Sequence, residues 1–166
     1  MPVSVEESVA WSRALAKRTA GNFYFTFLTL PEAMLRDMCV LYAFMRLSDD
    51  LGDDTSVPVA ERAARLNRWE AALQQALDGG PCAHQVFPAL VELVERRRIP
   101  RQYLLDVLTG VRMDLDPAGF GTFAELEGYC YHVAGAVGLC CLHVWGFASD
   151  DAVPLGELTT AILERL

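Results

Sequence analysis

Apolar residues recur at three- and four-residue intervals along most of the chain, which is the pattern of amphipathic helices. The stretch 58–78 shows it plainly, because its large apolar side chains fall on one stripe: Leu66, Trp69, Leu73 and Leu77. No pair of segments has the sustained alternation expected of partner strands. The pattern therefore predicts a single all-α domain over residues 1–166.

Capping residues, prolines and glycines mark the ends of the predicted helices. Ser4 with Glu7 and Thr122 with Glu125 have the spacing of capping boxes, and four further helices begin at a proline. The aromatic residues 22–28 would also fit a strand, but without a partner strand they favour a helix. The expected helices cover residues 4–18, 22–28, 31–53, 58–78, 84–97, 100–115, 122–147 and 154–166.

One predicted helix contains a long run without charge. From Gly128 to Ala148 there is no Asp, Glu, Lys or Arg, and this length would cross a bilayer. The run also holds two histidines, three cysteines and four glycines, which lowers its apolar content. A helix buried inside a helical protein gives the same signal. Burial is the favoured interpretation, and a membrane span is the alternative.

Composition and charge describe a globular, acidic protein. Hydrophobic residues make up 52% and charged residues 22% of the sequence. A net charge of −8 argues against nucleic acid as a partner, because no basic stripe is present to replace counterions. Five cysteines without CxxC spacing indicate reduced, mostly buried thiols. The acidic N-terminus lacks the features of a signal peptide, so a cytoplasmic location is expected.

Four carboxylates lie within six positions at the end of the helix expected for 31–53: Asp49, Asp50, Asp53 and Asp54. Like charges four residues apart destabilise a helix, and Gly52 costs about 1 kcal/mol against alanine. A helix with only a structural role would avoid both features. Paired carboxylates suit Mg²⁺, whose coordination is completed by substrate phosphates. The alternative is a solvated acidic helix end that leads into a loop at 55–58.

Two further side chains precede the carboxylates on the same stripe. At roughly 100° per residue, one narrow face carries Tyr42, Arg46, Asp49 and Asp53. An arginine one turn before the acids can bind phosphate oxygens directly. An acidic protein that binds an anionic diphosphate needs such cations. The stripe therefore predicts a metal–diphosphate site.

A second candidate site lies in the uncharged helix. Tyr129, Val133, Ala136 and Val137 share a face. Two glycines close by, at 135 and 138, cost roughly 1.5–2 kcal/mol against alanine, so they make room for something. One interpretation is a slot for a long apolar ligand with the Tyr129 hydroxyl at its mouth. The other is close helix–helix packing, with His132 as an ordinary side chain.

Four blocks of this sequence, taken together, resemble the squalene/phytoene synthase family. They follow the family's order at similar spacing and extend over most of the chain. The blocks are Phe23-Tyr24 with Leu30-Pro31, residues 41–53 from Leu41 to Asp53, Gly110-Val111-Arg112-Met113-Asp114-Leu115, and residues 129–138 from Tyr129 to Gly138.

The resemblance implies an isoprenoid-synthase helical bundle and a prenyltransferase activity. The expected reaction joins two prenyl diphosphates, farnesyl or geranylgeranyl, head to head into a squalene- or phytoene-type product of isoprenoid biosynthesis. Loss of one diphosphate gives an allylic cation, which the double bond of the second substrate attacks to form a cyclopropyl diphosphate. Mg²⁺, with Mn²⁺ as a substitute, would assist this step, and NADPH would be needed only for a reductive second step.

The resemblance also assigns roles to single residues. By the family's pattern Asp49 and Asp53 would hold Mg²⁺ with help from Asp50. Arg46 would bind diphosphate, and Tyr42 and Tyr129 would lie near the reacting carbons. The prenyl tunnel would be shaped by Phe23, Val133, Ala134, Val137 and Gly138.

The sequence departs from the family in two places. Basic or small polar residues usually precede the first aromatic block, where this chain has Ala20-Gly21-Asn22. Family members are also nearly twice as long and carry a second aspartate motif, for which Asp114 and Asp116 are the nearest counterpart here. The expected bundle thus lacks its C-terminal helices, and little turnover is expected from this chain alone. A second chain that supplies the missing motif is one option.

Two alternatives concern role and location. A non-catalytic relative of the family could keep the fold as a binding or assembly module. Peripheral membrane contact is also open, because substrate and product are greasy, although no basic amphipathic helix is present.

Overall fold

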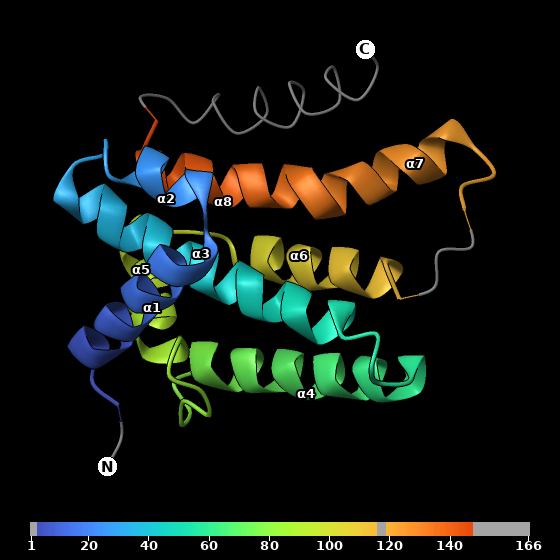
Figure 1. The fold of residues 1–166 in the computed structure, drawn as a ribbon, viewed down its shortest axis with the longest axis horizontal. Coiled ribbons are helices and arrows are strands. Elements are labelled where there is room, and N and C mark those ends of the chain that lie inside the picture. Colours follow the sequence, from blue (N-terminus) through green and yellow to red (C-terminus); the bar gives the residue numbers. More distant parts are fainter. Residues whose placement is uncertain (1–2, 116–118, 148–166) are drawn as a thin grey trace.

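The computed structural model describes residues 3–115 and 119–147 (Figure 1). Over these residues the protein is helical and contains no strand. The helices are α1 (Val5–Thr19), α2 (Asn22–Phe27), α3 (Glu32–Asp53), α4 (Val59–Leu77), α5 (Phe87–Arg97), α6 (Arg101–Met113), α7 (Phe123–Cys130), the π-helix η1 (Tyr131–Gly135) and α8 (Ala136–Trp145).

The predicted helix ends are confirmed to within one to three residues over this part of the chain. Both capping boxes form, at Ser4 before α1 and at Thr122 before α7. The largest shift is in α5, which begins at Phe87 and not at His84. There the His84 ring accepts the backbone N–H of Val86 at 3.2 Å, which holds residues 84–86 in a turn. The helix expected for 154–166 lies outside the described residues.

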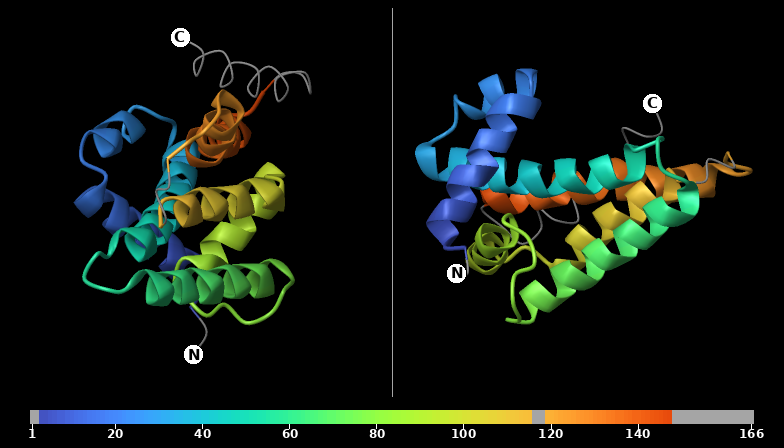
Figure 2. Two further views of the ribbon diagram at one scale, coloured as in Figure 1. Left: turned by 90° about the vertical axis from the view of Figure 1, so that its right-hand side faces the viewer. Right: turned by 60° about the horizontal axis from the view of Figure 1, so that its bottom comes forward.

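Helix α3 is the centre of the bundle. It packs against α1, α4, α5, α6 and α8, and the ribbon shows it between the α7–α8 rod and α4 (Figure 1). Helix α1 lies across the others (Figure 2). The apolar stripe of α3 supplies Leu41 and Phe44 to the core, where both are fully buried. The position of α3 places its other face, with Tyr42 and Arg46, against α2, α6 and α8.

A buried ion cluster joins α3 to α5. Asp37 of α3 is 1% exposed and binds Arg97 Nε at 2.7 Å and Arg96 at 3.1 Å. Two arginines on one buried carboxylate satisfy its charge, which an unpaired buried acid could not tolerate. The cluster fixes the start of α3 relative to α5, on the opposite end of α3 from the acidic residues.

The uncharged segment is not one continuous, buried α-helix. Helices α7, η1 and α8 follow one another along a single rod (Figure 1), with a π-turn at Tyr131–Gly135. No residue of α7 is buried, whereas α8 buries one face that includes Leu139 and Cys140. The prediction of whole-helix burial is therefore wrong for α7. None of the helices in the described ranges combines the length and apolar character that crossing a membrane requires.

Candidate active site

A cavity of about 790 Å³ opens beside α3. Its walls come from the end of α1, from α2, α3, α6, η1 and α8. Along α3 its lining begins at Met38 and ends at Asp49, a span of about 16 Å at 1.5 Å per residue. The wall is aliphatic and aromatic at the Met38 end and becomes charged at Arg46 and Asp49. Helix α6 adds Asp114 to the polar part of the lining.

The structure brings six of the predicted site residues to this cavity. They come from α2, α3, η1 and α8 and are Phe23, Tyr42, Arg46, Asp49, Val133 and Val137. The hydroxyl of Tyr42 donates to Thr19 Oγ1 at 3.2 Å, and Thr19 also lines the cavity. This contact orients the phenol between α1 and α3. Tyr42, Arg46 and Asp49 of the α3 stripe therefore line the cavity, whereas Asp53 does not.

Arg46 has one hydrogen-bond donor without a partner among the described residues. Its terminal nitrogen binds Asp50 Oδ1 at 2.5 Å, one turn further along α3. Its Nε is buried and has no hydrogen-bond partner among the described residues. A buried, unsatisfied N–H is costly, so such a donor is suited to a ligand oxygen. An anionic ligand in the cavity would meet this demand.

Asp49 is a residue of the cavity whose pKa is clearly raised. Its pKa is raised from 3.8 to about 6, mainly because the carboxylate is removed from water and next because of the charge of Asp53. Arg46 acts against these effects, while Asp50 and Asp114 add smaller contributions in the same direction as Asp53. Asp49 is an exposed residue that lines the cavity, so solvent and ligands can reach its carboxylate. Such a site favours either a proton or a bound cation.

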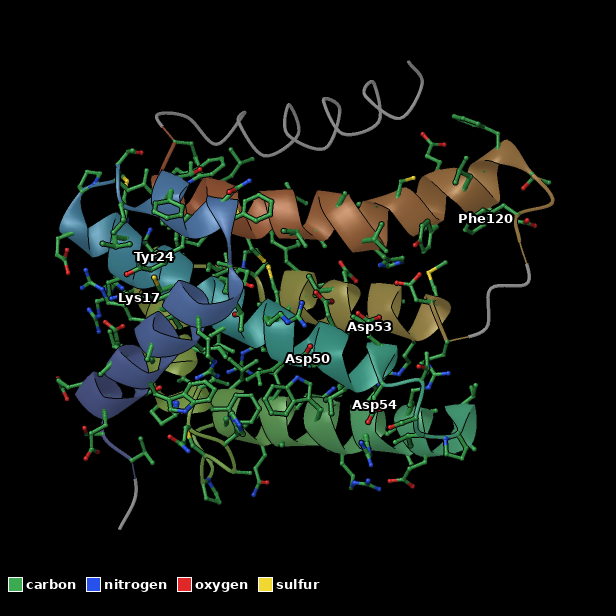
Figure 3. All side chains as sticks on the ribbon, viewed as in Figure 1. Lys17, Tyr24, Asp50, Asp53, Asp54 and Phe120 are labelled. Carbon is green, nitrogen blue, oxygen red and sulfur yellow. The ribbon has the colours of Figure 1, made fainter. Side chains whose placement is uncertain are left out.

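The other predicted residues do not line the cavity. Asp50, Asp53 and Asp54 leave the end of α3 in different directions, Asp54 toward α4 (Figure 3). Asp53 still acts on Asp49 through its charge. Ala134 and Gly138 are exposed on the outer side of the rod, so they do not shape a tunnel in this structure. The reason is geometric, since Val133 and Val137 occupy the inward face and their next neighbours in sequence point away.

Tyr129 lies behind the cavity wall. Its hydroxyl donates to Asp114 Oδ1 at 2.7 Å, and its ring packs against Phe120 with centroids 5.0 Å apart. The hydrogen bond to Asp114, followed by burial, raises the pKa of the phenol. Tyr129 thus contacts a residue of the cavity but is not part of its lining.

The sequence profile of squalene/phytoene synthases matches residues 16–161. This chain belongs to the squalene/phytoene synthase family.

Named relatives agree with the assignment. The chain is 33% identical to 15-cis-phytoene synthase of Synechococcus elongatus, over 95% of this chain and 50% of the relative. It is likewise 33% identical to a chloroplastic phytoene synthase of Narcissus pseudonarcissus, over 87% of this chain and 34% of the relative. The chain spans half or less of the length of these relatives.

Solved structures show the same fold. A dehydrosqualene synthase in complex with ligand aligns with a TM-score of 0.73 and 30% identity, over 84% of this chain and 48% of that one. Squalene synthase HpnC from Alicyclobacillus acidocaldarius aligns with a TM-score of 0.83 and 27% identity, over 98% of this chain and 61% of that one. The expected isoprenoid-synthase helical bundle is confirmed.

The carboxylates at the end of α3 do not form a three-carboxylate metal site, but they fit Mg²⁺ bound by one or two carboxylates. No group of three or more His, Cys, Asp or Glu side chains is arranged to hold a metal within the described ranges. The set Asp49, Asp50 and Asp53 therefore does not converge, because Asp50 is bound to Arg46 and points away. Mg²⁺ needs only one or two carboxylates together with water and substrate phosphate. Asp49, with Asp53 one turn on, fits that mode.

Asp114 and His132 line the cavity but are not among the predicted site residues. Asp114, one of the two nearest counterparts of the missing aspartate motif, lines the same cavity as Asp49. His132, an ordinary side chain if the helices simply pack closely, lines it as well. Both lie in blocks that resemble the family, Gly110–Leu115 and Tyr129–Gly138. That clustering was the available signal, but spacing along one helix does not show which face meets another helix.

Proposed function

We propose that this chain binds a prenyl diphosphate and Mg²⁺ in the cavity beside α3, as part of a head-to-head prenyl diphosphate condensation. The family's chemistry is condensation of this type, with phytoene- or squalene-type products. One observation carries the proposal for this chain. The cavity changes along α3 from an apolar wall at Met38 to Arg46 and Asp49, which matches a ligand with a greasy tail and an anionic head.

The residues divide the work of ionising an allylic diphosphate. The unpartnered Nε of Arg46 would donate to a diphosphate oxygen. Asp49, assisted by the charge of Asp53, would hold the divalent cation. When bound, Mg²⁺ neutralises the charge that builds on the leaving diphosphate. Tyr42 and the aromatic wall from Phe23 would exclude water from the carbocation.

Calorimetry of farnesyl diphosphate binding, with and without Mg²⁺, tests the proposal. Binding should require Mg²⁺ and should weaken at least tenfold in Asp49→Ala, because a charged contact is worth about 1.5–3 kcal/mol. Asp53→Ala should weaken it less, since its carboxylate does not line the cavity. Geranylgeranyl diphosphate is the second substrate to compare.

Asp54→Asn is the matched control. Asp54 belongs to the same acidic cluster, but its carboxylate binds Ser56 and Arg65 and does not line the cavity. This variant should bind farnesyl diphosphate as the wild type does. Equal affinity in the wild type and Asp49→Ala, both with Mg²⁺, would contradict the metal assignment.

A further inference from the structure

A close approach between α6 and η1 places a histidine against a buried carboxylate. Asp106 and Gly110 are four residues apart, so both face the same way from α6. A Cβ at Gly110 would lie 3.0 Å from the backbone C and O of His132. Only glycine allows the two backbones to approach this closely without a shift. The approach brings the His132 ring beside Asp106.

Asp106 is buried and carries an unusual set of neighbours. The residue as a whole is 7% exposed. It accepts hydrogen bonds from Gln102 Nε2 at 2.8 Å and from the Tyr131 hydroxyl at 2.8 Å. Both donors are neutral, and in the described part of the chain no Lys or Arg nitrogen lies within 4.0 Å of it. The group that can carry a positive charge is His132, whose Nδ1 lies 4.0 Å from Asp106 Oδ1. A buried carboxylate without a cation is costly, so Asp106 favours a proton on that Nδ1.

The other imidazole nitrogen is then left for the cavity. Nδ1 of His132 is buried and makes no hydrogen bond within the described residues, while the residue itself lines the cavity. With a proton on Nδ1, Nε2 carries the free electron pair. A carboxylate on one nitrogen and a reacting proton at the other is how histidine acts as a base in catalytic triads.

The condensation needs a base, and this inference rests on the proposed function. Two allylic diphosphates give a cyclopropyl diphosphate, one free diphosphate and one proton. After the new carbon–carbon bond forms, the positive charge sits on a tertiary carbon. A C–H bond must then break, and its electron pair closes the third side of the ring. The released proton has to pass to an acceptor within the cavity.

Tyr129 is poorly placed for this task. It does not line the cavity, and its hydroxyl already donates to Asp114. That hydrogen bond raises the pKa of the phenol, which disfavours the phenolate that a base would need. Of the described residues of α7, η1 and α8 that line the cavity, His132 is the one with a basic side chain.

We propose that His132 is the catalytic residue that takes this proton on Nε2, with Asp106 as its positioning residue. The proton adds to the free electron pair of Nε2, and the imidazolium that results is stabilised by Asp106. The proton on Nε2 then passes to the released diphosphate or to water. The charged groups that line the same cavity are Arg46, Asp49 and Asp114, and none has a recorded contact with the ring.

Two cationic ligands test the acceptor without requiring turnover. Farnesyl-dimethylammonium imitates the carbocation and carries one N–H, whereas farnesyl-trimethylammonium has the same charge and no N–H. Each is titrated with inorganic diphosphate and Mg²⁺ present. The wild type should prefer the dimethyl ion about tenfold, the worth of one charged hydrogen bond. His132→Phe should remove the preference and leave the affinity for the trimethyl ion unchanged.

His143→Phe is the matched control, because His143 contacts the carbonyl oxygen of Arg97 at 3.2 Å and does not line the cavity. It should keep the tenfold preference. No preference in the wild type, or a preference that survives His132→Phe, would overturn the role of His132 and leave the proposed function standing. If neither ammonium ion nor farnesyl diphosphate binds, the proposed function itself fails, and the inference fails with it.

Nitrogen NMR of the histidine rings tests the role of Asp106 directly. In the unliganded wild type His132 should be the tautomer with the proton on Nδ1. This measurement does not depend on the folding of any variant. Asp106→Asn should shift the ring toward the Nε2–H form and reduce the ammonium preference. A purely structural role for Asp106 would leave the tautomer unchanged. A wild-type ring with its proton on Nε2 would refute the assignment.

Discussion

Asp49 shows how one side chain can be both a cost to the fold and the basis of a site. The carboxylate stands in a hollow beside Asp53, and its pKa rises to about 6 because it is removed from water and lies among like charges. A protein selected only for stability would replace it. The unfavourable charge at neutral pH is what a cation or a proton can relieve.

Asp49→Asn should therefore stabilise the unliganded protein at neutral pH. The folded pKa, about 6, lies above the unfolded value of 3.8, so the folded state binds the proton more tightly. Stability from this group is complete below pH 4 and is lost as the pH rises through 6. The side chain is open to the cavity, so the gain in Asp49→Asn is at most about 1 kcal/mol at pH 7.5. Urea unfolding at pH 7.5 and 4 measures it, and an equal gain at both values would refute the argument.

His84 should produce the opposite dependence on pH. Burial lowers the pKa of its imidazole below 6.5, and the ring packs edge-on against Trp11 and Trp69 at 5.3 and 5.2 Å. Because the folded pKa is depressed, its contribution to stability is present above pH 6.5 and is lost as the pH falls.

The variant His84→Asn isolates this effect. An Asn side-chain oxygen can still accept the N–H of Val86, two residues on, but it does not take up a proton. The melting temperature of the wild type should fall more steeply between pH 7.5 and 5 than that of the variant. Parallel curves would show that another group is responsible.

Among the helices, the effect of a glycine on packing depends on the neighbouring helix that it faces. The sequence suggests that Gly135 and Gly138 make room for something. In the structure Gly138 meets no described atom within 4 Å of its Cβ position, whereas Gly110 on α6 meets the backbone of His132 at 3.0 Å. Of Gly110 and Gly138, the one that permits close packing is therefore Gly110, on the opposite helix. Periodicity places a residue on a face, but it does not say what that face contacts.

The pair Gly110→Ala and Gly138→Ala makes this measurable. Alanine at 138 should raise the free energy of unfolding by about 0.5–1 kcal/mol, because the position is helical and open. Alanine at 110 must push η1 away from α6 and should cost about 1–3 kcal/mol, as overpacked cores do. Denaturant unfolding of both variants gives the two signs. If Gly110→Ala also raised the free energy of unfolding, the rod would adjust to α6 without strain.

For the whole molecule, the sequence predicted the helices well and the site in part. Proline and capping signals placed most helix ends, because they are set by local backbone chemistry. Of the stripe on α3, Tyr42, Arg46 and Asp49 line a cavity, and their predicted role in binding metal and diphosphate stays a prediction. The π-turn at Tyr131–Gly135 was not predicted, since no local residue preference marks it. Asp114 and His132 were missed because their roles depend on how α6 and η1 pack around α3.

Turnover by these 166 residues alone should be slow even where binding is tight. A head-to-head condensation brings two diphosphates together, and Arg46 is the one Lys or Arg among the described residues that lines the cavity. One arginine and a cation at Asp49 can neutralise about one diphosphate, so the second would be repelled. Product formation from labelled farnesyl or geranylgeranyl diphosphate should therefore be small and should rise when a polypeptide that corresponds to the remaining half of a relative is added. Robust turnover without it would contradict the charge argument, while binding with no turnover under either condition would favour a non-catalytic binding or assembly module.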